Sequence, residues 1–191
     1  MKNRNIFKRP ATGLLLLAGA AFTTAHANDV DYNYLEARYI FDADVESVDG
    51  DGFELAGSFR IDKDFYAFGR FTTLDFDQNI DTDQFEIGAG YIYPINQKWD
   101  ANFTFSFVNI DTSTPVISSD DNGFAISAGV RGMMTQKIEG RAAVTYIDVD
   151  GNDTFITLGG DYMIKPNLSI GLEADLAGDL DTLSIGARYY F

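Results

Sequence analysis

The final segment of the chain, from Leu183 to Phe191, alternates between two kinds of side chain. The odd positions are apolar, and the even positions carry Ser, Gly, Arg and Tyr. A period of two places successive side chains on opposite faces of a β-strand. In a soluble domain the apolar face would pack on a core, whereas in a transmembrane barrel it would face lipid while the polar face lines the lumen. The rest of the chain must distinguish these two classes.

Further segments of similar length repeat this alternation. Roughly ten residues is the length of a tilted strand that crosses a bilayer. The segments cover residues 32–41, 52–61, 65–75, 84–94, 99–109, 122–132, 138–148, 153–163, 168–176 and 182–191. The pattern predicts an all-β fold, an antiparallel up-and-down transmembrane β-barrel of ten strands. Eight strands remain the alternative if two of the weaker segments are loops.

The first 27 residues have the features of a secretory signal peptide. They combine a basic start between Lys2 and Arg9, an apolar run over residues 11–22 and the small-x-small cleavage site Ala25-His26-Ala27. The apolar run is too short for a membrane-spanning helix. We therefore expect an exported protein, with a signal peptide over residues 1–27 and one barrel domain over residues 28–191.

The composition excludes several classes of function. The formal net charge is −15, with 29 acidic residues against 14 basic ones, so nucleic acid is excluded as a partner. The chain has no cysteine, and its single histidine, His26, lies in the signal peptide. Glu173 and Asp175 could form a catalytic carboxylate pair, but arginines on the same face favour ion pairs instead. We expect no enzymatic activity, no catalytic residue and no cofactor.

Lysine and arginine occur in different places along the predicted barrel. One lysine falls in each of four short connections: Lys63, Lys98, Lys137 and Lys165. The arginines after residue 27 all fall inside strands, where a charge facing lipid would cost a few kcal/mol, so we expect them to face the lumen. With acids on the same face they form a predicted lumen charge network: Glu36, Arg38, Glu54, Arg60, Arg70, Glu86, Asp100, Arg131, Glu139, Arg141, Asp161, Glu173, Asp175 and Arg188.

The other set of connections is predicted to be longer and is rich in Asp and Gly. It comprises residues 42–51, 76–83, 110–121, 149–152 and 177–181. Short turns at one rim and longer loops at the other are typical of outer-membrane barrels, which predicts an acidic extracellular rim. We expect no metal site. Asp148, Asp150 and Asp153 are weak candidates, because the run lacks the glutamate that completes a calcium-binding loop. Aromatic residues near both strand ends predict two belts at the membrane interfaces.

The opening Tyr32-Asn33-Tyr34-Leu35-Glu36, the Asp/Gly loops and the terminal Arg188-Tyr189-Tyr190-Phe191 carry a family resemblance. The chain resembles the small outer-membrane β-barrel proteins of Gram-negative bacteria, the OmpA-like and opacity-type barrels and their porin-like relatives. The resemblance implies location in the cell outer membrane, with membrane lipid and lipopolysaccharide as partners. It also implies recognition by the barrel-assembly machinery through Phe191, with an assembly signal made of Leu183, Ile185, Ala187, Tyr189 and Phe191. OmpA differs in having eight strands and a peptidoglycan-binding domain. The resemblance therefore does not imply that this chain anchors the membrane to peptidoglycan.

These observations predict an integral outer-membrane protein with a non-enzymatic envelope or surface role and an acidic extracellular rim, present as a monomer. The alternative is a narrow, cation-preferring diffusion pore for small solutes. Ten strands is close to the size at which side chains fill the lumen, so a wide porin is excluded. A less favoured class is a secreted soluble β-protein that binds an apolar ligand.

Overall fold

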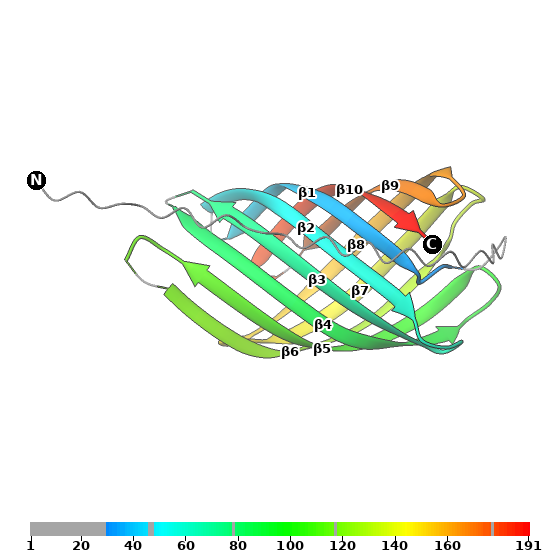
Figure 1. Cartoon of the computed structure of the whole chain (residues 1–191), viewed down its shortest axis with the longest axis horizontal. Coiled ribbons are helices and arrows are strands. Elements are labelled where there is room, and N and C mark those ends of the chain that lie inside the picture. Colours follow the sequence, from blue (N-terminus) through cyan, green and yellow to red (C-terminus); the bar gives the residue numbers. More distant parts are fainter. Residues whose placement is uncertain (1–29, 46–47, 78, 117, 177) are drawn as a thin grey trace, which may run out of the picture.

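The computed structural model describes residues 30–191 apart from residues 46, 47, 78, 117 and 177. The signal peptide predicted over residues 1–27 therefore lies outside the described residues. In the described part of the chain, ten β-strands form one closed barrel (Figure 1). They are β1 (Tyr34–Val45), β2 (Val48–Arg60), β3 (Phe65–Phe76), β4 (Ile80–Pro94), β5 (Trp99–Ser113), β6 (Ser118–Met133), β7 (Ile138–Asp148), β8 (Asn152–Lys165), β9 (Leu168–Leu176) and β10 (Leu180–Tyr190).

Every strand is antiparallel to its neighbours in the sequence, and β1 pairs with β10 to close the barrel. This confirms the predicted all-β, up-and-down fold and decides for ten strands over eight. No helix in the described residues is long and apolar enough to span a membrane.

The two ends of the barrel differ in charge. The turns over residues 61–64, 95–98, 134–137 and 166–167 lie at the end where β1 begins and β10 finishes, on the right in Figure 1. We call it the lysine end, because Lys63, Lys98, Lys137 and Lys165 lie in or beside these turns. We call the opposite end, which is rich in aspartate, the acidic end.

The connections at the acidic end are shorter than the sequence predicts. Strands continue through most of residues 42–51, 76–83 and 110–121, which the composition assigns to loops. Aspartate has a low propensity for strands, so the composition of these segments does not predict that they pair as strands. The strands nevertheless stay paired through these segments, because each continues the backbone hydrogen bonding with its neighbour. The predicted acidic loops are therefore largely acidic strand ends.

The outer wall of the barrel is apolar. Leu55, Ile87, Phe105, Leu172 and Ile185, from five different strands, are all exposed on it. Their strand neighbours point inward, as the period of two requires. In β10 the residues of the predicted assembly signal, Leu183, Ile185, Ala187 and Tyr189, lie on this outer face, and Phe191 follows the strand.

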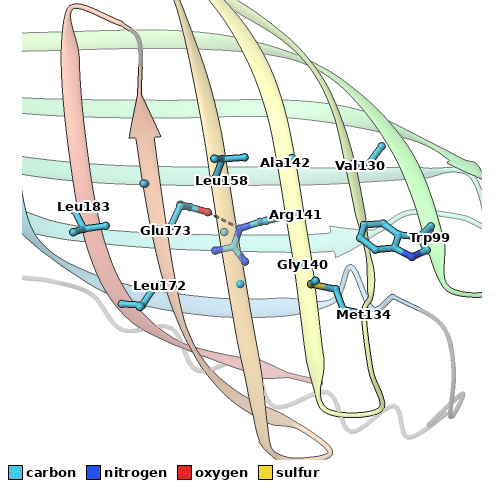
Figure 2. A pocket seen from close by; sticks show the side chains of 13 residues that line it. Trp99, Val130, Met134, Gly140, Arg141, Ala142, Leu158, Leu172, Glu173 and Leu183 are labelled. Carbon is cyan, nitrogen blue, oxygen red and sulfur yellow. Dashed lines mark hydrogen bonds and ion pairs between the residues drawn. The ribbon is translucent and has the colours of Figure 1, made fainter.

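One part of the outer wall is hollowed (Figure 2). Two glycines that line it, Gly140 and Gly160, are register partners across β7 and β8. Trp99 and Leu172 lie among the larger side chains around them, and the hollow has a volume of about 430 Å³. We call this feature the outer groove.

A β-bulge changes the faces of β1 near the acidic end. The register of β1 against β10 shifts between Ile40 and Asp42. Ile40 and Ala43 are both buried inside the barrel, whereas Asp44 is exposed. Since a bulge inserts one unpaired residue, the odd positions face outward before it and inward after it.

Candidate functional site in the barrel lumen

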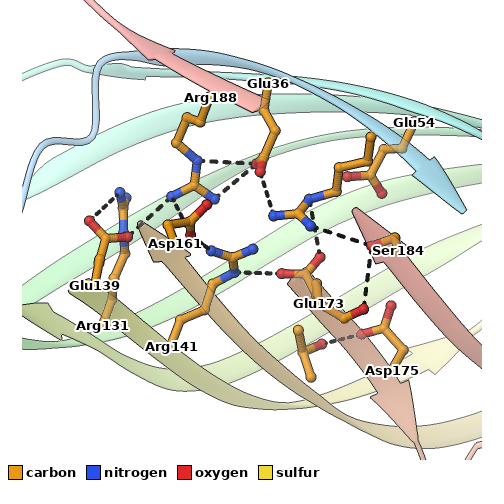
Figure 3. A network of polar contacts seen from close by, with 12 residues as sticks. Glu36, Glu54, Arg131, Glu139, Arg141, Asp161, Glu173, Asp175, Ser184 and Arg188 are labelled. Carbon is orange, nitrogen blue, oxygen red and sulfur yellow. Dashed lines mark hydrogen bonds and ion pairs between the residues drawn. The ribbon is translucent and has the colours of Figure 1, made fainter. Parts of the chain in front are cut away.

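Four arginines and four carboxylates of the described chain meet inside the barrel (Figure 3). They come from β1 and from β6 to β10, and we call them the lumen network: Glu36, Arg38, Arg131, Glu139, Arg141, Asp161, Glu173 and Arg188. Their side chains are between 1% and 13% exposed. Equal numbers of positive and negative charges therefore share one buried volume.

Arg188 joins three carboxylates of the lumen network. Its Nη2 lies 2.9 Å from Glu36 Oε2, and its Nη1 lies 3.2 Å from Glu139 Oε1. The same Nη1 lies 3.8 Å from Asp161 Oδ2. Glu36 and Arg188 belong to the first and the last strand, so this contact bridges the line at which the barrel closes.

The remaining contacts complete a ring. Arg38 Nη2 lies 2.5 Å from Glu36 Oε1, and Arg38 Nε lies 3.7 Å from Glu173 Oε1. Arg141 donates from Nε to Glu173 Oε2 over 2.5 Å and from Nη1 to Asp161. Arg188 then connects Asp161 back to Glu36.

Arg131 and Glu139 attach to this ring as a bidentate pair. Arg131 Nε donates to Glu139 Oε1 over 2.6 Å, and its Nη2 donates to Oε2 over 3.1 Å. Parallel donation of this kind fixes orientation as well as distance.

Glycines on the lumen face make room for the guanidinium groups. A Cβ on Gly159 would lie 2.6 Å from Arg141 Nε, and a Cβ on Gly186 would lie 2.5 Å from Arg38 Cγ. Each glycine is the register partner of the arginine it accommodates. Arginine side chains therefore occupy the space beside these two glycines.

A second group of charges lies on the opposite wall, on β2, β3 and β4. Arg70 Nε lies 3.6 Å from Glu54 Oε2 and 3.8 Å from Glu86 Oε2. Ser106 Oγ donates to Glu86 Oε1 over 2.6 Å. The Arg70 side chain is 38% exposed to the space inside the barrel. This wall therefore carries two carboxylates around one partly solvated arginine.

The other residues of the predicted lumen network lie outside these two groups. Arg60 donates to the Val30 carbonyl over 3.2 Å at the lysine end. Asp175 accepts hydrogen bonds from Thr157 over 2.5 Å and from Thr182 over 3.2 Å. Asp100 is the register partner of Arg131 at the start of β5.

A cavity of about 180 Å³ separates the lumen network from the Glu54–Arg70–Glu86 wall. Its lining runs from Tyr32 and Tyr66 at the lysine end to Phe155 towards the acidic end. At about 30 Å³ per water molecule, it has room for about six waters.

An apolar cluster fills the lysine end of the lumen. Val30, Tyr32, Tyr66 and Ile92 are buried together, and the rings of Tyr32 and Tyr66 lie 4.8 Å apart. The guanidinium of Arg131 lies 5.0 Å from the centre of the Tyr32 ring, within reach of a cation–π interaction. Val30 and Tyr32 precede β1, so the segment that enters the barrel covers its mouth. We call this cluster the tyrosine plug.

The aromatic residues do not all follow the predicted belts. Tyr32 and Phe76, which the sequence pattern places in opposite belts, pack inside the barrel, and the Tyr34 ring lies under Arg188 at 4.3 Å. Phe76 belongs to an apolar cluster near the acidic end with Ile40 and Leu74. For Tyr34 and Phe76 the missed signal was parity, because each shares the lumen face of its strand with charged neighbours.

Aspartates form rows on the outside of the barrel at the acidic end. Each row consists of three exposed aspartates that are register partners across adjacent strands. The rows are Asp181–Asp44–Asp49, Asp51–Asp75–Asp81 and Asp83–Asp111–Asp120. Like charges directly opposite each other destabilise a strand pair, by about 0.2–1 kcal/mol.

We therefore expect added sodium chloride to raise the thermal unfolding midpoint in an uncharged detergent, because salt screens exposed charges. Changing Asp75 and Asp111 to Asn should raise the midpoint at low salt and weaken its dependence on salt. Asp64→Asn, at the lysine end beside Lys63, is the control and should leave the salt dependence unchanged. Equal salt dependence in all variants would contradict this account.

The weak metal candidates remain apart from any cluster of ligands. Asp153 accepts hydrogen bonds from the backbone N–H groups of Thr154 and Asp179, and Asp150 adopts a positive φ of 49° in the turn before β8. No group of three or more His, Cys, Asp or Glu residues within the described ranges could hold a metal ion.

No protein-family model matches the chain, and no curated protein matches it. Its barrel is similar to a solved structure described as "KdgM porin", with a TM-score of 0.50 and 12% identity over 83% of this chain and 99% of that one. A second structure, "KdgM porin in complex with disordered oligogalacturonate", gives a TM-score of 0.51 and 14% identity over the same shares. Ail of Yersinia pestis gives a TM-score of 0.44 and 15% identity, over 83% and 97%.

The chain has the fold of an outer-membrane β-barrel. This confirms the family resemblance noted from the terminal strand at the level of fold. The outer-membrane barrel fold also accounts for the direction of the side chains, with apolar residues outside and charged residues inside.

Proposed function

We propose that the protein is an integral outer-membrane β-barrel with a non-enzymatic role in the cell envelope, a closed lumen and an acidic extracellular rim. The observation that supports this most strongly is the inversion of polarity across the wall. Charged side chains such as Arg188 and Glu139 are buried, while Leu55, Ile87 and Phe105 are exposed. Contiguous apolar surface of this kind is stable in lipid and prone to association in water.

The same inversion argues against a secreted soluble β-protein that binds an apolar ligand. Such a protein would need an apolar interior, but the middle of this barrel holds ion pairs. The mutual pairing of Glu173 with Arg141 also favours a structural role over catalysis by carboxylates.

The second candidate function is a narrow, cation-preferring path for small solutes. The cavity beside Glu54, Arg70 and Glu86 supports it, because this space is polar and two of the three charges are negative. The acidic end would also repel anions. A KdgM porin structure was solved with oligogalacturonate, which is a polyanion, and the charge of this chain disfavours such a solute.

The proposed partners follow from the outer wall. Membrane lipid, including the acyl chains of lipopolysaccharide, would contact its apolar band. The outer face of β10, with Ile185, Tyr189 and then Phe191, supports recognition by the barrel-assembly machinery. We propose a monomer that acts without nucleic acid or cofactor.

Fractionation of cells that express the full chain tests the location. We expect the protein in the outer-membrane fraction, with a gel migration that changes on boiling, as a folded barrel requires. Phe191→Ser should lower the amount assembled in cells without preventing refolding in detergent. Recovery of folded protein in the soluble fraction would overturn the proposal.

Current measurements on the refolded protein in a planar bilayer separate the two candidate functions. A silent bilayer, with folding confirmed by the gel shift, supports the closed envelope protein. Discrete cation-selective steps that change with Glu54→Gln would instead support the pore.

A further inference from the structure

The outer groove has a floor of glycines that is only partly covered by the protein. A Cβ on Gly140 would lie 2.8 Å from Met134 Sδ. A Cβ on Gly160 would meet nothing closer than the Glu139 carbonyl at 3.8 Å. The floor is therefore covered by a side chain at Gly140 and open at Gly160.

Glycine in the interior of a strand weakens the strand, and it often marks a place where a ligand approaches the backbone closely. At Gly160 no side chain of the protein lies close to the position that a Cβ would occupy. Leu172 is the register partner of Gly160 on β9, and Leu158 lies two residues before it on the same face of β8; both are exposed. The open floor with apolar walls fits an apolar occupant.

The volume and the elongated shape of the outer groove indicate which class of apolar molecule it could bind. Its volume of about 430 Å³ lies within the ~300–1,000 Å³ of small-molecule sites. It extends from Trp99 and Met134 beside the lysine-end turns to Leu183 on the last strand (Figure 2). This elongated, apolar shape suits a hydrocarbon chain.

Two lysines of the lysine-end turns are close in the sequence to residues that line the outer groove. Lys98 directly precedes Trp99, and Lys137 shares the turn over residues 134–137 with Met134. Both are exposed, and Lys137 Nζ lies 5.9 Å from the centre of the Tyr162 ring. Trp and Tyr rings are typical of the interface level of a membrane, where lipid phosphates also lie. The charge of these lysines complements an anionic headgroup.

We propose that the outer groove binds one anionic phospholipid, with an acyl chain over Gly160 and the headgroup phosphate between Lys98 and Lys137. This inference rests on the proposed function, since it requires the barrel to stand in a bilayer. Basic residues at the membrane surface attract anionic lipids in this way.

Native mass spectrometry of the full chain tests the proposal. The protein is refolded into bilayers of equimolar phosphatidylglycerol and phosphatidylcholine and then released into mild detergent. We expect one retained lipid per barrel, with about a ten-fold excess of phosphatidylglycerol over phosphatidylcholine. Gly160→Leu should abolish the adduct, because the new side chain fills the groove. Lys98→Gln with Lys137→Gln should keep the adduct but remove the preference for phosphatidylglycerol.

Gly69→Leu is the matched control. Gly69 lies on the outer face of β3, away from the groove, and a Cβ there would meet only the Glu86 carbonyl at 3.6 Å. It should retain the lipid as the unchanged protein does. An adduct equal in Gly160→Leu and Gly69→Leu would overturn the inference, as would a dimer that Gly160→Leu dissociates. A chain that stays soluble without detergent would overturn the proposed function itself. A folded barrel without a retained lipid would overturn only this inference.

Discussion

Replacing Arg188 with methionine should lower the free energy of unfolding by about 3–5 kcal/mol, the usual cost of removing one partner of a buried ion pair. Arg188 contacts Glu36 and Glu139 inside the lumen network, so its loss leaves four buried carboxylates against three guanidiniums. Methionine keeps much of the volume, which separates the loss of charge from the loss of packing. Urea unfolding in lipid vesicles, followed by the fluorescence of the single tryptophan, measures the effect.

Arg70→Met is the graded control for this prediction. Arg70 also faces carboxylates, but its side chain is 38% exposed and its distances are 3.6 and 3.8 Å. We expect a loss of about 1 kcal/mol or less, as for partly solvated pairs. The double variant Arg188→Met with Glu36→Gln should recover part of the loss, because it removes one uncompensated charge. Equal losses for Arg188→Met and Arg70→Met would show that burial of the lumen network contributes little.

The second large effect is expected at the tyrosine plug. Tyr32→Ala should convert a silent bilayer into one with discrete, cation-selective current steps. The cavity lies between the lumen network and the Glu54–Arg70–Glu86 wall and reaches Tyr32 and Tyr66, so removing one ring should extend it towards the mouth at the lysine end. The remaining charges along this path, Glu54 and Glu86, set the preference for cations.

Tyr91→Ala is the matched control, since Tyr91 is exposed on the outer wall and its ring pairs with Phe65. It should stay silent. Tyr66→Ala provides a second test of the plug should Tyr32→Ala fold poorly, and the gel shift reports folding in each case. A silent bilayer for both folded plug variants would show that the lumen network, rather than the plug, closes the barrel.

The sequence was sufficient to predict an all-β, up-and-down barrel, with ten strands favoured over eight, and it predicts that arginines inside strands face the lumen. These depend on the period of two and on the cost of charge in lipid, which are local and strong constraints. Which charges pair could not be predicted. Arg188 and Glu139 are joined across the lumen, and their contact depends on register and rotamers rather than on any spacing along the chain.

Other misses have similar physical origins. The sequence pattern predicts that the first strand ends at residue 41, whereas β1 continues to Val45 beyond a β-bulge after Ile40 that exchanges its two faces. The segment at Val30 and Tyr32 precedes the first strand, where periodicity carries no information. Its burial follows from packing of Tyr32 against the Tyr66 ring and the Arg131 guanidinium.

The pairing of β1 with β10 has a consequence for the order in which the strands of the barrel pair during folding. Every other strand pair joins neighbours through a short connection, whereas Glu36 and Arg188 are separated by 152 positions. Pairing of distant segments is slow, because the chain must lose its loop entropy before the contact can form. The two edges should therefore meet last, and the ion pairs of that seam would form only once all the hairpins are in place. Closure, rather than strand formation, would then set the rate at which the protein matures.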